Sequence, residues 1–309
     1  MIYTDLITGF LGSGKTTFIK KYAQYLTQHN NNIGILENDY GAINIDMMLL
    51  QDLPKENCDL EMVIGGDYDC HRRRFKTKLI SMGMTGFDRV VVEPSGIYDV
   101  DEFTDVLCEE PLDRWYQIGS MIAIVDAGIG TEALTEESEY LLMTQTACAG
   151  ILVFSKVQQT APAEIEKTKA LIKRIWEKYD CGTLDDERLL IKDWNDLTDA
   201  DFEQILTAGC YPADHIKMMV DRDNGYTSLF FMNRSLPEER IRKITDTLFN
   251  DPFLGNIIRF KGFSLQEDGS WISINATKNE RDICPCEKGQ DVMIIIGEGL
   301  NKDKIENLF

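Results

Sequence analysis

The chain has 309 residues, 43% of them hydrophobic, which is enough for one large domain or two smaller ones with a sizeable core. A net charge of −20 would repel nucleic acid and anionic membranes, so we expect neither as a partner. The sequence shows no positive region ahead of an apolar run and no stretch of roughly 18 apolar residues, which favours a cytoplasmic protein. In that reducing compartment, the 8 cysteines are expected to be thiols or metal ligands.

The first predicted elements enclose a phosphate-binding motif. Residues 9–17 read Gly-Phe-Leu-Gly-Ser-Gly-Lys-Thr-Thr, and they lie between an apolar strand at 2–8 and a helical pattern. In such a loop, backbone N–H groups and the N-terminus of the helix bind a polyphosphate. We expect Lys15 to reach the β and γ phosphates and Thr16 to hold Mg²⁺. The predicted phosphate ligands are Gly12, Ser13, Gly14, Lys15, Thr16 and Thr17.

Acids follow two further predicted strands. The apolar residues 33–36 lead into Glu37 and Asp39, and residues 89–92 lead into Glu93, with Gly96 three positions later. We expect Glu93 to orient hydrated Mg²⁺ and the N–H of Gly96 to sense the γ-phosphate. Glu37, Asp39 or both are expected to sense the nucleotide or position the attacking water. The alternative for residues 93–96 is an ordinary exit from a strand.

The chain continues as alternating strands and helices. Residues 63–66 are predicted as a strand or turn, residues 72–82 as a basic helix, and residues 121–126, 151–154 and 189–191 as strands. Helical patterns cover residues 140–149 and 162–179. Nearly all-apolar strands that alternate with helices predict an α/β fold with a mostly parallel sheet, in which ligands bind at the carboxyl ends of the strands.

The rhythm changes beyond about residue 215, and residues 222–225 read as a boundary loop. We therefore predict two domains, 1–215 and 223–309. In the second, strands are expected at 227–232, 257–263, 271–277 and 292–296, with helices at 237–249 and 302–309. This order predicts a smaller α+β domain.

The motifs resemble those of the CobW-type P-loop GTPases, which are related to UreG and HypB. The resemblance rests on residues 9–17, 37–41, 45–46, 93–96 and 125–127, and it continues into the second domain at 259–262 and 294–297. It implies slow hydrolysis of GTP with Mg²⁺. It also implies delivery of a metal or metallocofactor, a cobalamin-related cargo being one candidate, to a client metalloprotein or cofactor-dependent enzyme.

The metal motif of this family is altered here. Relatives carry Cys-x-Cys-Cys after the strand that here ends at residues 65–66, and an acid where this chain has Ala42. In this chain the candidate ligands are Asp67, Asp69, Cys70 and His71, a set with harder oxygen donors and a different metal preference. The alternative is that the site is lost and the aspartates cap the following helix. Residues 284–286, Cys-Pro-Cys, are a second candidate pair, expected in a loop.

The base-recognition motif is altered too. GTP-specific relatives read guanine with Asn-Lys-x-Asp, where this chain has Ser155, Lys156, Val157 and Gln158. A hydrogen bond to a charged group contributes on the order of 1.5–3 kcal/mol. Its loss should relax guanine preference roughly ten- to a hundredfold unless another acid replaces it. We still expect Ser155 and Lys156 to contact the nucleotide, with GTP favoured and ATP open.

Three functions therefore remain open. The first is a switch that hydrolyses NTP to drive metal delivery or activation. The second is a nucleotide-binding activator or scaffold with little turnover and no metal cargo. The third is a small-molecule kinase, in which residues 72–74, three arginines, would form a lid instead of a solvated helix face. Oligomers are compatible with each.

Overall fold

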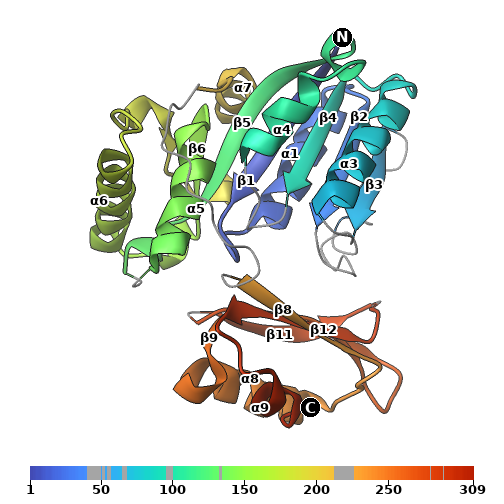
Figure 1. The fold of residues 1–309 in the computed structure, drawn as a ribbon, viewed down its shortest axis with the longest axis vertical. Coiled ribbons are helices and arrows are strands. Elements are labelled where there is room, and N and C mark those ends of the chain that lie inside the picture. The colour runs from blue at the N-terminus through green and yellow to red at the C-terminus, as the bar shows by residue number, and fades with distance from the viewer. Residues whose placement is uncertain are drawn as a thin grey trace. The chain divides into compact units, whose positions relative to one another are not determined.

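The computed structural model describes residues 1–39, 50, 53, 57–64, 68–94, 100–131, 134–211, 226–278, 280–287 and 289–309. The chain separates into two compact units, Met1–Met218 and Met219–Phe309, both drawn in Figure 1. The predicted boundary loop at 222–225 lies outside the described residues. The limits 1–215 and 223–309 therefore stay a prediction.

The first unit is built on a parallel sheet of seven strands in the order β3-β2-β4-β1-β5-β6-β7. The strands are β1 (Ile2–Gly9), β2 (Ile33–Asp39), β3 (Cys58–Ile64), β4 (Arg89–Pro94), β5 (Tyr116–Asp126), β6 (Ile151–Ser155) and β7 (Leu189–Leu190). Their apolar runs are buried because helices cover both faces of the sheet. The predicted α/β class with a parallel sheet is confirmed.

Six helices of the described residues accompany this sheet (Figure 1). They are α1 (Lys15–Gln28), α3 (Tyr68–Gly83), α4 (Val100–Leu107), α5 (Glu136–Ala147), α6 (Pro162–Lys178) and α7 (Asp199–Thr207). The sequence patterns do not predict α4 or α7, since eight or nine residues give only about two turns of periodicity. The basic helix begins at Tyr68, earlier than predicted, so Asp69 and Cys70 belong to α3.

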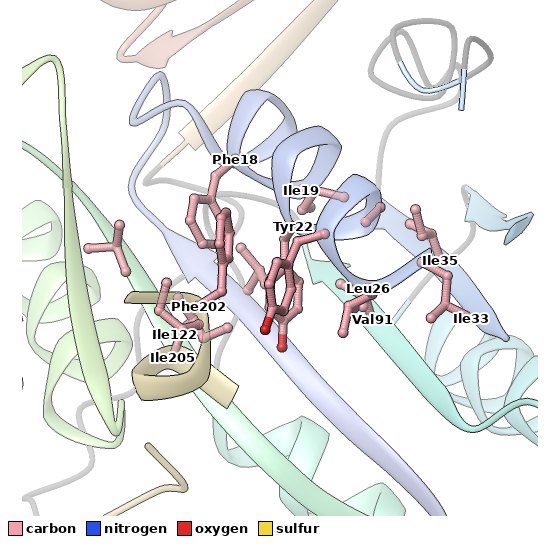
Figure 2. Packing of buried hydrophobic residues seen from close by; sticks show 14 of the residues in the cluster. Phe18, Ile19, Tyr22, Leu26, Ile33, Ile35, Val91, Ile122, Phe202 and Ile205 are labelled. Atoms are coloured by element: carbon pink, nitrogen blue, oxygen red, sulfur yellow. The ribbon is translucent and has the colours of Figure 1, made fainter. Parts of the chain in front are cut away.

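One face of the sheet is sealed by α1 and α7. Figure 2 shows Phe18, Tyr22 and Leu26 of α1 directed onto the sheet, where Val91 and Ile122 lie. Every one of these side chains has almost no exposure, so the packing holds α1 firmly against the strands. The loop that precedes α1 is thereby fixed at the end of β1.

A buried polar network reinforces this attachment. Asp5 of β1 has no exposure, and its carboxylate accepts hydrogen bonds from Arg89 Nη1 at 2.5 and 2.6 Å and from the Tyr22 hydroxyl at 2.7 Å. Burial, and next the charge of Asp5, raise the pKa of Tyr22 well above its usual value, so Tyr22 stays a donor. The network ties β1 to β4 and α1.

The second unit is an antiparallel sheet of five strands in the order β11-β10-β9-β12-β8, with helices packed on one face (Figure 1). Its elements are β8 (Tyr226–Met232), α8 (Glu238–Asn250), β9 (Asn256–Leu265), β10 (Trp271–Ala276), β11 (Arg281–Cys286), β12 (Val292–Glu298) and α9 (Lys302–Glu306). The predicted α+β class is confirmed. The loop predicted for residues 284–286 is wrong, because they belong to β11, an edge strand, where a proline is tolerated.

Candidate functional site

The phosphate-binding motif forms the turn between β1 and α1, at the carboxyl end of the central strand. Gly9, Gly12 and Gly14 adopt φ angles of 148°, 76° and 95°, which side chains rarely accept. A Cβ atom on Gly9 would also lie 2.4 Å from the backbone oxygen of Ile124. The glycines are therefore required by this backbone, which leads directly into the N-terminus of α1.

Lys15 and Ser13 prepare the turn for an anionic ligand. Lys15 is only 6% exposed, and its Nζ atom donates to the Gly9 oxygen at 3.0 Å and to the Phe10 oxygen at 3.5 Å, so the ammonium is held over the turn. The Ser13 hydroxyl is buried and makes no hydrogen bond within the described protein. A phosphate oxygen would accept hydrogen bonds from both the Lys15 ammonium and the Ser13 hydroxyl. Thr17, another predicted phosphate ligand, is exposed in the first turn of α1.

Two buried carboxylates lie beside this turn. The Thr16 hydroxyl donates to Glu93 Oε1 at 3.0 Å, and Glu93 of β4 is directly in register with Glu37 of β2. Glu93 and Glu37 are 4% and 3% exposed. Neighbouring buried carboxylates repel each other unless a cation or proton lies between or beside them. A hydroxyl and carboxylate oxygens are also the donors that Mg²⁺ prefers, so the residues fit the predicted magnesium site.

Asn38 was not singled out by the sequence patterns. It follows Glu37 in β2, its side chain is 1% exposed, and neither amide atom makes a hydrogen bond within the described protein. Leaving such a group unsatisfied costs roughly 1–3 kcal/mol. The only sequence signal is its position between two acids at a strand end.

Several predicted residues cannot be placed in the site. Gly96 and Asp67 lie outside the described residues, and the side chains of Asp39, Asp69 and Cys70 also lie outside them. His71 is described and is fully buried on α3. Among the described residues, no cluster of three His, Cys, Asp or Glu side chains could hold a metal ion. The mixed metal site of Asp67, Asp69, Cys70 and His71 therefore stays a prediction.

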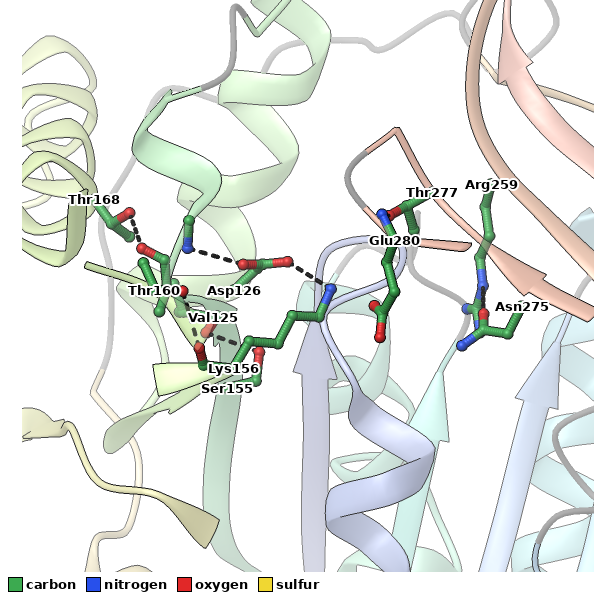
Figure 3. A network of polar contacts seen from close by, with 12 residues as sticks. Val125, Asp126, Ser155, Lys156, Thr160, Thr168, Arg259, Asn275, Thr277 and Glu280 are labelled. Atoms are coloured by element: carbon green, nitrogen blue, oxygen red, sulfur yellow. Dashed lines mark hydrogen bonds and ion pairs between the residues drawn. The ribbon is translucent and has the colours of Figure 1, made fainter. Parts of the chain in front are cut away.

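The predicted base-binding residues lie at the end of β6 and directly after it, and β6 is two strands from β1. Lys156 has a φ of 57°, and its Nζ binds Asp126 Oδ2 at 2.8 Å (Figure 3). Gly128 N donates to the other carboxylate oxygen of Asp126 at 2.9 Å. The Ser155 hydroxyl donates to the Val125 oxygen at 3.3 Å, so it is directed at the backbone of β5. Lys156 and Asp126 thus form a fixed pair at the carboxyl edge of the sheet.

Trp194 joins this edge to the phosphate-binding turn, although the sequence patterns did not indicate it. A Cβ atom on Gly14 would lie 3.3 Å from the indole ring and 3.8 Å from the Cβ of Ser155. The indole Nε1 donates to the Phe154 oxygen at 2.9 Å, and the ring meets Phe18 edge-on at 5.4 Å. The loop after β7 therefore forms a wall of the site. The sequence signal that could have identified Trp194 is a tryptophan shortly after the last predicted strand.

Comparisons with known proteins agree with these motifs. The chain is 29% identical over 183 residues to the zinc chaperone YeiR of Escherichia coli, a match that covers 58% of this chain and 52% of that protein. It is 28% identical over 166 residues to the zinc chaperone YjiA of the same organism, covering 48% and 51%. The chain thus matches about half the length of these curated relatives.

Solved structures with similar folds include Zn(II)-bound YjiA GTPase from Escherichia coli, at 18% identity and a TM-score of 0.38, covering 100% of this chain and 98% of that one. HypB from Helicobacter pylori in complex with nickel is 16% identical with a TM-score of 0.40, covering 66% and 83%. The sequence profile of the family described as CobW/HypB/UreG, nucleotide-binding domain, matches residues 3–181, more than half of the chain. This chain therefore belongs to the CobW/HypB/UreG nucleotide-binding domain family.

Proposed function

We propose that this protein is a nucleotide-dependent switch that binds Mg²⁺-NTP, with GTP favoured, and hydrolyses it slowly. The observation that carries the proposal is the group formed by Lys15, Thr16, Glu93 and Glu37 around the glycine turn. Lys15 and the backbone N–H groups of the turn hold the β and γ phosphates. Bound Mg²⁺ would neutralise charge on the phosphates, and Thr16 and Glu93 would hold it.

The other predicted residues have distinct roles in this proposal. Glu37, alone or with Asp39, positions the attacking water, and Gly96 senses the γ-phosphate. Segments 37–46 and 65–76 then relax after hydrolysis, because their contacts differ between the two nucleotide states. Those segments carry the surface for the client or the cargo.

The active site is tested with Lys15→Ala, measured by phosphate release and by nucleotide affinity. The exposed Lys173 of α6 supplies a matched control, Lys173→Ala, which removes the same charge far along the chain. Hydrolysis is expected to disappear in Lys15→Ala and nucleotide binding to weaken, while the control keeps both. Unaltered hydrolysis in Lys15→Ala would overturn the assignment of the site.

Metal delivery is the proposed purpose of the cycle. It draws support from the family and from relatives named as zinc chaperones. The affinity of the protein for Zn²⁺, Co²⁺ and Ni²⁺ should then differ between the GTP and GDP states. Equal affinities in both states, or no binding of the three metals, would exclude metal delivery and favour the activator.

The activator or scaffold is the second candidate function, and the altered residues favour it. A protein with Gln158 in place of the guanine-reading acid and with an altered metal motif could bind nucleotide tightly and turn it over only when a client is present. Its client would be a metalloprotein or a cofactor-dependent enzyme, including a corrinoid protein. Hydrolysis measured with and without extracts of such clients separates this function from a free-running GTPase.

A kinase function has less support, because Arg72 of its proposed lid is bound to a carboxylate of the same unit. The Arg72 guanidinium binds Glu109 Oε1 at 2.5 Å, and Lys76 Nζ binds Glu109 Oε2 at 2.6 Å. These bonds, that of Lys76 first, hold the pKa of Glu109 below its usual value. Arg72 thus fastens α3 to the segment after α4. Phosphate that appears on water instead of an added metabolite would exclude a kinase.

A further inference from the structure

Strand β11 places two thiols and a carboxylate on one face of the second sheet. Cys286, Cys284 and Asp282 are in register with Trp271, Ser273 and Asn275 of β10. The intervening residues point the other way: Ile283 is buried in the core, and the Arg281 guanidinium lies 4.0 Å from the Phe249 ring of α8. Since side chains alternate along a strand, Asp282, Cys284 and Cys286 share the face opposite α8.

Pro285 fixes this arrangement. Its ring locks its own φ angle, and it restricts Cys284 to extended conformations. Cys284 is therefore held in the extended geometry that keeps its side chain on the same face as that of Cys286, before any ligand arrives. A proline is tolerated here because β11 is an edge strand, which pairs with β10 alone.

The spacing favours a bridging ion over a disulfide. Residues i and i+2 of a strand are about 6.6–6.8 Å apart along the chain. That is the upper limit for the Cα atoms of a disulfide, which usually lie about 5.5–6 Å apart. A metal ion with bonds of about 2.3 Å to each sulfur spans a wider gap between two side chains. Neither thiol is in a disulfide, Cys284 is exposed and Cys286 is half-buried.

The charges around the pair suit a cation. Asp282 lies two residues before Cys284 on the same face of β11, and its carboxylate attracts a positive ion. The partners on β10 are uncharged. Among the described residues of this sheet, the Arg259 guanidinium of β9 is bound to Asn275 Oδ1 at 3.2 Å (Figure 3).

We propose that Cys284 and Cys286 form a two-thiolate site for a thiophilic divalent cation such as Zn²⁺ or Co²⁺, with Asp282 as its charged neighbour. On binding, each thiol releases its proton to solvent and each sulfur donates a pair of electrons to the metal. Two protein ligands leave two positions of a tetrahedral ion open to water or to an incoming ligand. Such a site exchanges its metal readily. It does not depend on the nucleotide cycle.

The test is a titration of the reduced full-length chain with Co²⁺, without nucleotide, followed by the absorption band of cobalt–thiolate charge transfer. The variant Cys284→Ser/Cys286→Ser is expected to lose this band, or to lose at least about tenfold in Co²⁺ affinity where another thiol contributes. The matched control is Cys108→Ser/Cys210→Ser, which changes two exposed cysteines of the first unit and should keep the band. Circular dichroism verifies that each variant is folded.

Two further variants sharpen the result. Asp282→Asn keeps both thiols and should weaken binding about two- to fivefold, as expected for an exposed charge. Cys70→Ser tests whether Cys70, the predicted metal ligand on α3, contributes to the absorption band. A band that survives in Cys284→Ser/Cys286→Ser with unchanged Co²⁺ affinity, or that disappears only with Cys70→Ser, overturns the proposal. A disulfide between Cys284 and Cys286, detected by mass spectrometry in the freshly reduced protein, would also overturn the proposal.

Discussion

Gln158 stands where GTP-specific relatives have the acid that reads guanine, and it lies exposed in the turn after β6. We expect Gln158→Asp to restore that acceptor. The ratio of GTP to ATP affinity should then rise by roughly ten- to a hundredfold. Isothermal titration with both nucleotides measures it. Gln159→Asp adds the same charge one residue further along and is the control; an equal rise in both variants would mean that charge alone, and not base reading, is responsible.

Asn38 permits a second prediction, in which stability and activity change in opposite directions. Replacing its buried amide by the similarly sized Leu should raise the free energy of unfolding by about 1–3 kcal/mol, because two unsatisfied polar atoms are removed. Hydrolysis should fall if the amide serves the ligand beside Glu37. Urea unfolding and phosphate release measure the two effects.

Thr4→Val is the control for Asn38→Leu. Thr4 also has a buried hydroxyl without a hydrogen bond, but it lies near the start of β1. It should gain stability and keep hydrolysis unchanged. A loss of both stability and hydrolysis in Asn38→Leu would instead show that the amide supports the fold.

At the scale of single residues, the sequence predicted those site residues that belong to a short motif or to the end of a predicted strand. Lys15 and Thr16 belong to one short motif, and Glu93 was predicted from its position at a strand end; the Thr16–Glu93 hydrogen bond confirms their proximity. Trp194 could not be found this way, because its contact with Gly14 joins segments about 180 residues apart. Ser155 was predicted to contact the nucleotide, which stays a prediction, and its hydroxyl bonds to β5.

At the scale of elements, α7 has a well-defined start signal. Thr198 and Asp201 form a capping box, and Lys192 Nζ binds Asp201 Oδ2 at 2.7 Å. Burial opposes ionisation of Asp201, but the hydrogen bonds from Lys192 and Thr198 outweigh it and lower its pKa to about 2. The folded pKa is thus below the usual value near 3.9. The stabilisation is complete above about pH 4 and is lost as the pH falls toward 2.

We therefore expect Asp201→Asn to lower the free energy of unfolding at pH 7 by about 1 kcal/mol and to flatten its dependence on pH between about 4 and 2. Urea unfolding over that range measures both. Glu166→Gln on α6 is the control, because the carboxylate of Glu166 is largely exposed in its pair with Lys169. An equal loss in both variants would show that the capping box contributes nothing of its own.

The elements that the sequence predicted are those with a strong local pattern. The buried strands β1, β4, β5 and β6 are short, nearly all-apolar runs, which is the pattern expected for strands of a parallel sheet that is covered on both faces. β11 was missed because a proline in the run reads as a loop, and only its edge position makes the proline acceptable. The early start of α3 at Tyr68 was missed because residues 68–71 are polar and lack a helical period.

The described residues form two sheets of different kinds, each with a core of its own. Calorimetry should therefore record two unfolding transitions. Mg²⁺-GTP should stabilise only the unit with the phosphate-binding turn, by about 2.7 kcal/mol at a nucleotide concentration one hundred times the dissociation constant. Mg²⁺ alone is the control. One transition that moves as a whole would show that the units unfold together.

In the described part of the chain, no helix has the length and apolar character needed to cross a membrane. The two-unit division was predictable from the change in rhythm near residue 215. The limits 1–215 and 223–309 stay a prediction, because residues 212–225 lie outside the described residues.

The position of β1 at the centre of the first sheet has a consequence for how the protein is made. β1 pairs with β4 and β5, whose residues follow it by about 90 and 110 positions along the chain. A ribosome that has synthesised the glycine turn has therefore not yet synthesised the strands that hold it. We therefore expect the turn to bind nucleotide only after β5 has left the exit tunnel and paired with β1, so that nucleotide would stabilise the closed sheet and not the earliest steps of folding.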